Sequence, residues 1–520
     1  MKKFVENEIK EVDVWQLKKY ACKAKLIDIF TGKNIVVLNL DEAKEHDIYA
    51  GYRTHLKVNG TTITALVDVS DDLVKPGEIG LFRDIAKEFK IKAGQSIEVV
   101  HMNRPESISY IKKKLDKGTL NSYEVKTIVK DIMKDRLSEV ETAAWITAAY
   151  INGFSDEEVI SLAQATVESG DQLNLNKKPI LDKHCIGGVA GNRTTMIVVP
   201  IIAAAGLYIP KTSSRSITSA SGTADTMEVL TNVTLSMDEL RDIVCKAKGA
   251  IVWGGGMSLA PVDDKLIRIR HPLSLDPEGM LLASILGKKK SVGAEYALID
   301  IPIGRGVKVP YMERGQVLAK HFIKIGASLG MNVEAIITDG SEPIGNGIGP
   351  GLECIDVLQV LEGNGPDDLR HKSILMAGKL LELCKKVPKG GGYQAAQRII
   401  ENGKALNKFR EIVELQGGSP KVKTSDIEIG GYSKTITSDI SGSIFHIDNK
   451  AISKIARIAG SPRDKGAGLL LHIVRGDRIK KGDKLFTIFA ESEAKLDFAL
   501  KALKRLDPVE MRRILLGSMR

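Results

Sequence analysis

Residues 183–228 read KHCIGGVAGNRTTMIVVPIIAAAGLYIPKTSSRSITSASGTADTME, and this stretch decides the fold. It places glycines, hydroxyls and cations in three short turns around one apolar helix, expected over residues 196–205 with its amino terminus at residues 192–195. The free amide groups and partial positive charge of a helix amino terminus attract anions. The stretch therefore predicts a phosphate cradle in an α/β domain.

The first two turns carry residues suited to holding an anion. Gly187 and Gly188 let an anion approach the backbone, Lys183 adds a positive charge, and His184 offers a hydrogen-bond donor. An isolated Gly-Gly pair is more often only a tight turn. The neighbouring cation and the hydroxyls of residues 194–195 favour an anion site instead.

The third turn is rich in hydroxyl groups and precedes a helix expected to start near Ala224. Its polar residues are Ser213, Ser214, Arg215, Ser216, Thr218, Ser219, Ser221 and Thr223. Such a loop is more often a solvated linker, but this one lies between apolar segments and contains an arginine. We therefore expect its donors to face a bound anion.

Composition excludes several classes of protein. The apolar run 196–205 is shorter than the roughly 20 residues of a membrane span, and the amino terminus has no signal-peptide core. The five cysteines form no Cys-x-x-Cys pair, which excludes a disulfide framework and favours a cytoplasmic location. A net charge of +10 is spread over interspersed basic and acidic residues, which favours a solvated mixed surface over a nucleic-acid face; an anionic small substrate would also benefit from the surplus.

The chain is expected to be a multidomain α/β protein, since 520 residues exceed the size of a single core. Residues 1–103 predict a β-rich, barrel-like domain, because β-branched runs there are broken by glycines. Residues 104–176, with 260–292 contributing, predict a helical lobe that begins its helices with capping boxes. Residues 177–428 predict a large α/β domain with a mostly parallel sheet, and residues 429–520 an α+β, barrel-sandwich-like domain for interaction or packing.

Two further residues are candidates outside the cradle. Asp276 precedes an expected helix and is equally consistent with a helix cap and with a general acid. Lys308 follows a glycine turn at a strand end, where a lone lysine is more often a surface residue. The histidines have no partners at metal-ligand spacing, so no metal site is predicted.

Residues 213–228 resemble the signature of the thymidine and pyrimidine-nucleoside phosphorylases, and most closely of their AMP phosphorylase branch, known from archaea. Residues 182–188, DKHCIGG, resemble the phosphate-binding motif of that family. The first ~100 residues are similar to the extra amino-terminal domain of the AMP phosphorylase branch. Three positions depart from the family pattern: Cys185 replaces a serine of the nucleoside enzymes, and Ser216 and Ser221 are larger than usual.

The resemblance implies roles for single residues. Lys183, Thr195, Ser213 and Thr223 would bind the attacking phosphate, with Gly187 and Gly188 as backbone donors, and Asp276 would give a proton to the leaving base. Ser284 and Lys288 would lie near the base. A second anion site, for a 5′-phosphate, would be formed by Ser214, Arg215, Ser216, Ile217, Thr218 and Ser219 with Lys308.

The implied reaction is phosphorolysis of AMP to adenine and ribose 1,5-bisphosphate, with CMP and UMP as further substrates. Inorganic phosphate is then a co-substrate and no cofactor is expected; the resemblance also favours a homodimer or larger homo-oligomer. Three alternatives stay open: a nucleoside phosphorylase, a magnesium-dependent phosphoribosyltransferase, and a non-catalytic nucleotide- or RNA-binding protein. No motif separates adenine from cytosine or uracil.

Overall fold

The computed structural model describes residues 19–101, 105–216 and 219–512. Their contacts divide the chain into two compact units. The first unit extends to residue 153 and includes residues 266–275; the second contains residues 154–265 and everything from residue 276 onward. Ile217 and Thr218, which the resemblance places in the second anion site, lie outside the described residues.

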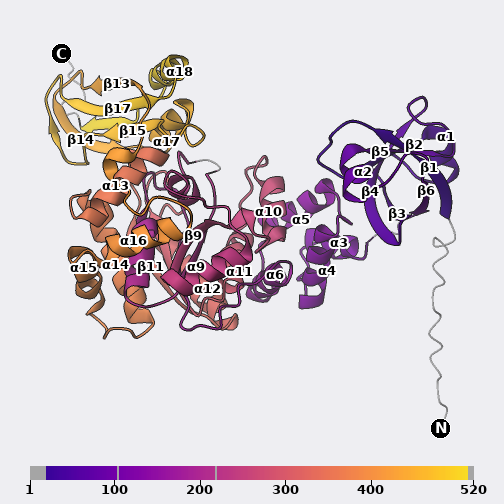
Figure 1. Ribbon diagram of the computed structural model, residues 1–520, viewed down its shortest axis with the longest axis horizontal. Coiled ribbons are helices and arrows are strands. Elements are labelled where there is room, and N and C mark those ends of the chain that lie inside the picture. Colours follow the sequence, from indigo (N-terminus) through magenta and orange to yellow (C-terminus); the bar gives the residue numbers. More distant parts are fainter. Residues whose placement is uncertain (1–18, 102–104, 217–218, 513–520) are drawn as a thin grey trace, which may run out of the picture. The chain divides into compact units, whose positions relative to one another are not determined.

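Six strands of the first unit close into a barrel in the order β1-β5-β2-β4-β3-β6 (Figure 1, indigo). They are β1 (Lys19–Ile27), β2 (Ile35–Asn39), β3 (Arg53–Val58), β4 (Thr61–Ser70), β5 (Glu78–Phe82) and β6 (Ser96–His101), with helices α1 (Leu40–Glu45) and α2 (Arg83–Glu88) between them. Alternate residues of β4, among them Ile63, Ala65 and Val67, are buried inside, as the two-residue period of a strand requires. Asn59 and Gly60 both have positive φ, which makes the tight hairpin between β3 and β4.

The first unit also contains helices α3 (Ser107–Leu115), α4 (Ser122–Met133) and α5 (Glu139–Asn152), and residues 266–270 of α10 (Pro261–Arg270). The predicted capping boxes are confirmed, since the hydroxyl of Ser138 accepts from the amide of Glu141, and Ser155 does the same for α6 (Asp156–Glu168). Helix α6 belongs to the second unit, because it packs on α11 (Glu278–Ser291). The expected helical lobe therefore spans both units.

Parallel strands form the centre of the second unit. They are β7 (Leu181–Cys185), β8 (Ile209–Ser213), β9 (Gly249–Trp253), β10 (Tyr296–Ile303) and β11 (Asn332–Asp339). The order β11-β10-β7 is parallel throughout, β8 pairs parallel with β9, and a bridge between Ile180 and Tyr208 connects the two sheets. The carboxyl ends of β7 and β8 therefore meet at one edge, where ligand sites of such sheets lie.

Helices cover both faces of this sheet. Leu298 of β10 joins the core around α7 (Thr194–Ala204), whereas Ile303, on the opposite face, lies against Gly315 of α12 (Met312–Ser328). Helix α7 is buried on all sides, which explains its uniformly apolar sequence and confirms the helix predicted there. The other helices of this part are α8 (Thr223–Met227), α9 (Met237–Ala247), η2 (Gly254–Gly256), α10 (Pro261–Arg270), α13 (Pro350–Glu362), α14 (Asp367–Leu383), α15 (Gly392–Glu401), α16 (Lys404–Leu415) and η3 (Thr424–Asp426).

The carboxyl-terminal part of the second unit has two antiparallel sheets and two helices (Figure 1, yellow). Its elements are β13 (Tyr432–Thr437), β14 (Gly442–Ile447), α17 (Asn449–Ile458), β15 (Gly468–Leu471), β16 (Arg478–Ile479), β17 (Lys484–Ala490), α18 (Glu493–Leu503) and β18 (Val509–Arg512). One sheet has the order β12-β15-β17-β13, in which β12 (Gly347–Ile348) comes from the segment before α13. The α/β part and the carboxyl-terminal part thus share a sheet. None of the helices in the described ranges is long and apolar enough to cross a bilayer.

Candidate active site

The glycine turn after β7 brings backbone close to two other segments. Gly187 and Gly188 have φ values of +94° and +101°, in the region that favours glycine. A Cβ atom on Gly188 would lie 3.0 Å from the Cα of Val307, and one on Gly191 would lie 2.2 Å from the carbonyl oxygen of Ile344. Gly188 and Gly191 are therefore required by conformation and by space. Gly187 is required by its conformation and has open space beside it, which leaves room for an anion.

The Lys183 side chain points from β7 to the amino terminus of α7. Its Nζ donates to Thr194 Oγ1 at 2.6 Å and to Thr195 Oγ1 at 3.1 Å. Burial lowers the pKa of Lys183 to about 8. A buried ammonium group beside the positive end of a helix is stabilised by a negative ligand, so this corner is suited to phosphate.

His184 and Cys185 follow Lys183 on the same strand but carry no charge at neutral pH. Burial, together with the charges of Lys289 and Lys211, holds the pKa of His184 well below its usual range. Burial raises the pKa of the Cys185 thiol to about 11, and Asn192 Nδ2 donates to its sulfur at 3.3 Å. His184 can therefore donate one hydrogen bond as a neutral ring, and Cys185 does not act as a thiolate.

A buried carboxylate lies near Lys183 within the sheet. Asp300 of β10 is fully buried, and its Oδ2 lies 3.0 Å from Nζ of Lys372 on α14. Thr338 Oγ1 donates to Asp300 Oδ1 at 2.6 Å. Burial alone raises the pKa of Asp300, but the charges of Lys372 and Lys183 outweigh it and the pKa is lowered. Asp300 is therefore ionised, with two lysines for one carboxylate.

The opposite face of β7 has the same imbalance of charge. Asp182 is fully buried, with Lys289 Nζ 2.7 Å from its Oδ2 and Lys211 Nζ 3.5 Å from its Oδ1. Both lysine side chains are at least 95% buried. The two faces together hold four lysines and two aspartates, and buried charges need partners. Burial lowers the pKa of Lys211 to about 7 and that of Lys183 to about 8, and an anion bound beside Lys183 would favour the charged form of this lysine.

The arginine of the third turn is already paired. Arg215 NH1 lies 2.7 Å from Glu228 Oε2 and 3.3 Å from Asp225 Oδ1, and its guanidinium lies 4.8 Å from the centre of the Trp253 ring. Hydrogen bonds from Arg215 and then Lys465 lower the pKa of Glu228 to about 2. In the ligand-free protein the charge of Arg215 is thus directed to two carboxylates of the same turn, and its contact with a bound anion stays a prediction.

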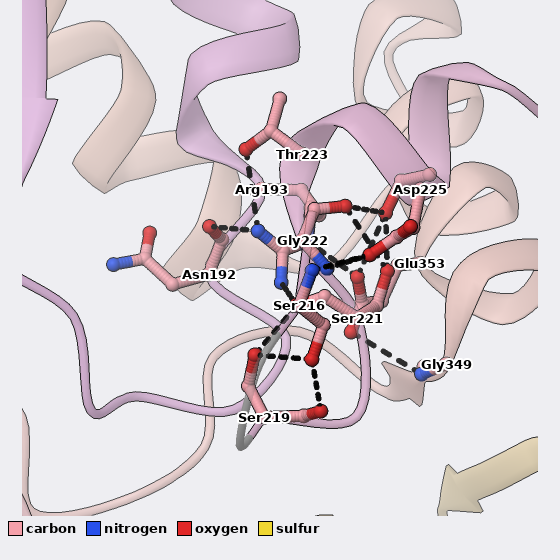
Figure 2. A network of polar contacts seen from close by, with 12 residues as sticks. Asn192, Arg193, Ser216, Ser219, Ser221, Gly222, Thr223, Asp225, Gly349 and Glu353 are labelled. Atoms are coloured by element: carbon pink, nitrogen blue, oxygen red, sulfur yellow. Dashed lines mark hydrogen bonds and ion pairs between the residues drawn. The ribbon is translucent and has the colours of Figure 1, made fainter. Parts of the chain in front are cut away.

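Serines of the third turn hydrogen-bond to one another. Ser216 Oγ lies 3.2 Å from Ser219 Oγ, and Ser219 Oγ donates to the carbonyl of Ser221 at 2.9 Å (Figure 2). Ser213 Oγ, at the end of β8, donates to the carbonyl of Ser214 at 3.4 Å, a long bond that a ligand can replace. The serine hydroxyls of the third turn thus form hydrogen bonds within the turn itself.

A buried ion pair joins this loop to α7. Arg193 donates through Nε to Glu353 of α13 and through NH1 to Thr223 Oγ1 at 3.3 Å (Figure 2). Thr223 starts α8 and is one of the expected phosphate ligands. Arg193 lay within the quoted motif without a role, and Glu353 was not singled out at all.

Asp276 and Lys308 form one ion pair. Lys308 Nζ donates to Asp276 Oδ2 at 3.0 Å, and the two side chains are 45% and 42% exposed. Helix α11 begins at Glu278 with Pro277 at its N-cap position, so Asp276 lies one residue before that position. The burial that would keep Asp276 protonated is also not present in this structure. Lys308, expected to form the second anion site with the hydroxyl-rich loop, pairs with Asp276.

Ser284 and Lys288 lie together on α11, one turn apart. Ser284 Oγ donates to Asp263 Oδ2 at 2.7 Å, and Lys288 Nζ lies 2.6 Å from the same oxygen. Asp263, which the sequence did not single out, thus orients both residues expected near the base. Within the described ranges, no three His, Cys, Asp or Glu side chains form a group that could hold a metal ion.

The carboxyl-terminal part also reaches the third turn. Lys465 Nζ donates to Glu228 Oε2 at 2.8 Å, and Arg457 NH1 donates to the carbonyl of Ser219 at 3.1 Å. An interaction or packing role was expected for this part of the chain, and the structure shows that it brings two cations to the third turn. Of the overlooked residues, Asp300 and Glu353 had a signal, because a carboxylate inside an apolar strand or helix indicates a buried charge.

Comparisons with known proteins agree with this architecture. The family models described as "Glycosyl transferase family, helical bundle domain" and "Glycosyl transferase family, a/b domain" match residues 108–170 and 177–406, and "Pyrimidine nucleoside phosphorylase C-terminal domain" matches residues 444–507. The multidomain α/β prediction is thus confirmed. A solved anthranilate phosphoribosyltransferase from Thermus thermophilus shares the fold, with a TM-score of 0.51 and 17% identity over 59% of this chain and 98% of its own.

Curated relatives match over almost the whole chain. AMP phosphorylase of Methanosarcina barkeri is 46% identical, covering 95% of this chain and 97% of the relative. AMP phosphorylase of Pyrococcus furiosus is also 46% identical, covering 94% and 97%, and AMP phosphorylase 1 of Archaeoglobus fulgidus is 43% identical, covering 94% and 96%. The chain therefore belongs to the AMP phosphorylase family.

Proposed function

We propose that this protein is an AMP phosphorylase, which converts AMP and inorganic phosphate to adenine and ribose 1,5-bisphosphate, and that it also accepts CMP and UMP. A phosphate oxygen bonds to the anomeric carbon of the ribose while the bond from that carbon to the base nitrogen breaks. The base leaves with one proton. The observation that carries the proposal is the buried surplus of positive charge around Lys183, beside a second, hydroxyl-rich loop.

The attacking phosphate is held between the first two turns and residues at the ends of the third. Lys183 contacts it from β7 and Thr195 from the amino terminus of α7, while Ser213 and Thr223 contact it from the third turn. Breakage of a glycosidic bond passes through a transition state with positive charge on the sugar, which an anion below the ring stabilises. The enzyme thus contributes position and charge. Positive charge comes from lysines, so we propose that no metal cofactor is needed and that a chelator leaves the rate unchanged.

Asp276 supplies the proton to the leaving base. In the ligand-free protein its carboxylate pairs with Nζ of Lys308 at 3.0 Å. The 5′-phosphate of the nucleotide competes for Lys308 as a stronger anion. Once Lys308 moves to the nucleotide, the carboxyl group of Asp276 is no longer held by this cation and can serve the base. This exchange makes the 5′-phosphate a condition for catalysis and explains a preference for nucleotides over nucleosides.

The base lies beside Ser284 and Lys288, whose positions Asp263 holds. Further expectations concern assembly and location: a homodimer or larger homo-oligomer, in the cytoplasm. Light scattering on the purified protein measures the mass of the assembly, and a monomer at working concentration would overturn the first of these expectations.

One incubation tests the proposed function. The protein is mixed with phosphate and AMP, CMP, UMP or the matching nucleosides, and free base and sugar bisphosphate are measured. Release of adenine and ribose 1,5-bisphosphate from AMP is expected, with and without chelator. Faster cleavage of uridine or thymidine would indicate a nucleoside phosphorylase, and activity that needs pyrophosphate and magnesium a phosphoribosyltransferase. Salt-sensitive RNA binding without base release would indicate a binding protein.

A further inference from the structure

We propose that the buried Arg193–Glu353 ion pair is a positioning pair, which sets the spacing between the two loops that hold the attacking phosphate. The first loop is residues 187–195 and the second loop is residues 219–226. The inference rests on the proposed function, because it concerns the phosphate of that reaction. It assigns a role to two residues that need not touch the substrate.

Arg193 binds both loops at once. Its side chain is 9% exposed, NH2 donates to the carbonyl of Ser221, and NH1 donates at 3.3 Å both to Thr223 Oγ1 in the second loop and to the carbonyl of Asn192 in the first. Nε donates to Glu353. Figure 2 shows this guanidinium between the two loops. A planar fork with donors in fixed directions is suited to holding several acceptors at set distances.

Glu353 fixes the guanidinium and the second loop together. Its side chain is 1% exposed, Oε2 also accepts from Thr226 Oγ1 at 3.0 Å, and Oε1 accepts from the amide of Gly349 at 3.2 Å. Thr226 Oγ1 in turn lies 2.8 Å from Ser221 Oγ. One carboxylate thus joins the second loop, the arginine and the start of α13.

The pair controls the distance between Thr195 and Thr223, the two proposed phosphate ligands that flank it. Thr195 lies two residues after Arg193 in the chain, and Thr223 accepts a hydrogen bond from Arg193. Both threonines are proposed ligands of one phosphate, and hydrogen bonds to it weaken steeply outside a narrow range of length and angle. Misplacement of a reacting group by about 1 Å can reduce the rate about 10²-fold.

Stability alone gives little reason for such a pair. A buried ion pair contributes little compared with apolar residues of the same size, because both charges lose their hydration. Arg193 is also one of the charges that lower the pKa of Lys183, so the negative charge of Glu353 balances the cradle as well. A fixed loop spacing accounts for the burial, for the number of bonds and for the choice of arginine.

Two variants and a matched control test the proposal. Arg193→Lys keeps the charge but cannot reach all four partners, and Glu353→Gln keeps the size but removes the charge. Glu334→Gln is the control, since Glu334 lies on β11 in the same domain and pairs with Lys379 at 3.5 Å. Initial rates give KM for phosphate and kcat separately, and hydrogen exchange of residues 219–226 is followed without substrate.

In Arg193→Lys we expect KM for phosphate to rise at least about tenfold, with a smaller change in kcat, and exchange in the second loop to be faster. Glu334→Gln should leave both unchanged. Wild-type KM and wild-type exchange, with only a lower melting temperature, would overturn the proposal. If Arg193→Lys does not fold, Glu353→Gln decides by the same readouts. If the wild type releases no base from any nucleotide, the proposed function fails, while the exchange data still decide the loop spacing.

Discussion

Lys308 Nζ lies 3.0 Å from Asp276 Oδ2, so the proposed proton donor and the proposed 5′-phosphate cation neutralise each other in the ligand-free protein. Both side chains are partly exposed, which leaves room for exchange of partners when a second anion arrives. In the proposed reaction, the pair connects recognition of the nucleotide phosphate to protonation of the base. Two predictions follow from this connection.

Asp276→Asn should lower kcat for AMP by about 10²- to 10⁴-fold, the usual contribution of a general acid, with little change in KM for phosphate. Release of adenine measured over time gives both constants. An N7-methylated AMP is the control substrate. Its cationic base leaves without taking up a proton, so its kcat should change little in this variant. Equal losses with both substrates would show that Asp276 is not the proton donor.

Lys308→Met should lower kcat/KM for AMP by about tenfold or more, since one charge-assisted contact to the 5′-phosphate is lost. Adenosine has no 5′-phosphate and should react at least as fast as with the wild type, because Asp276 is no longer held by a cation. The ratio of the two kcat/KM values is the measurement. An unchanged ratio would remove Lys308 from nucleotide recognition.

The pKa of Lys183, lowered to about 8 from its usual 10.5, gives a pH dependence with a definite sign. Above pH 8 the folded protein loses this proton while the unfolded chain keeps it, so the contribution of Lys183 to the free energy of unfolding rises between pH 8 and 10.5. Phosphate binding needs the charged form, so KM for phosphate should rise above about pH 8.

The matched variant is Lys183→Met, which removes the charge and keeps most of the volume. We expect kcat/KM for phosphate to fall about 10²-fold or more at neutral pH, and the rise in KM above pH 8 to disappear. Initial rates from pH 6 to pH 9.5 measure both. A variant that uses phosphate at the wild-type rate would contradict the site.

Arg215 and Glu228 should act on the stability of the third turn more than on chemistry. The lowered pKa of Glu228 means that its stabilising effect is present above its usual pKa of 4.5 and is lost as the pH falls toward 2. A double-mutant cycle of Arg215→Met and Glu228→Gln should give a coupling energy of about 1 kcal/mol, because the pair is partly exposed. Denaturant unfolding at pH 7 measures this coupling energy. A coupling energy near zero would show that the ion pair does not stabilise the turn.

Asp263→Asn should separate binding of the base from binding of phosphate. The variant weakens the hold on Ser284 and Lys288, so KM for AMP should rise about tenfold while KM for phosphate stays within about twofold. An equal rise in KM for AMP and KM for phosphate would show that Asp263 supports the packing of the domain and not the base site in particular.

Local patterns decided the elements that build the cradle. The uniformly apolar run over residues 196–205 could only be a buried helix, and α7 is that helix. Ser138 and Ser155 each stand three residues before a glutamate, and both start helices. Such features depend on neighbours within one or two turns, so the sequence alone contains them.

The partners of charged side chains could not be predicted from local patterns. Asp276 could be read as a cap or an acid, and only the position of Lys308 in the fold shows which cation holds it. Arg215 looked free to bind an anion until the structure placed Glu228 against it. An electrostatic partner acts through space, and spacing along the chain gives no measure of that distance.

By itself, then, the sequence determined the family, several of the helices and strands and the buried helix of the proposed phosphate cradle, because periodicity, caps and glycine turns are local. Only the tertiary structure decided that Arg193 and Glu353 join the two loops, that four lysines surround two buried aspartates, and that Arg457 reaches the third turn from the carboxyl-terminal part. These relationships arise when packing removes charged groups from water and leaves each of them to find a partner from a distant segment.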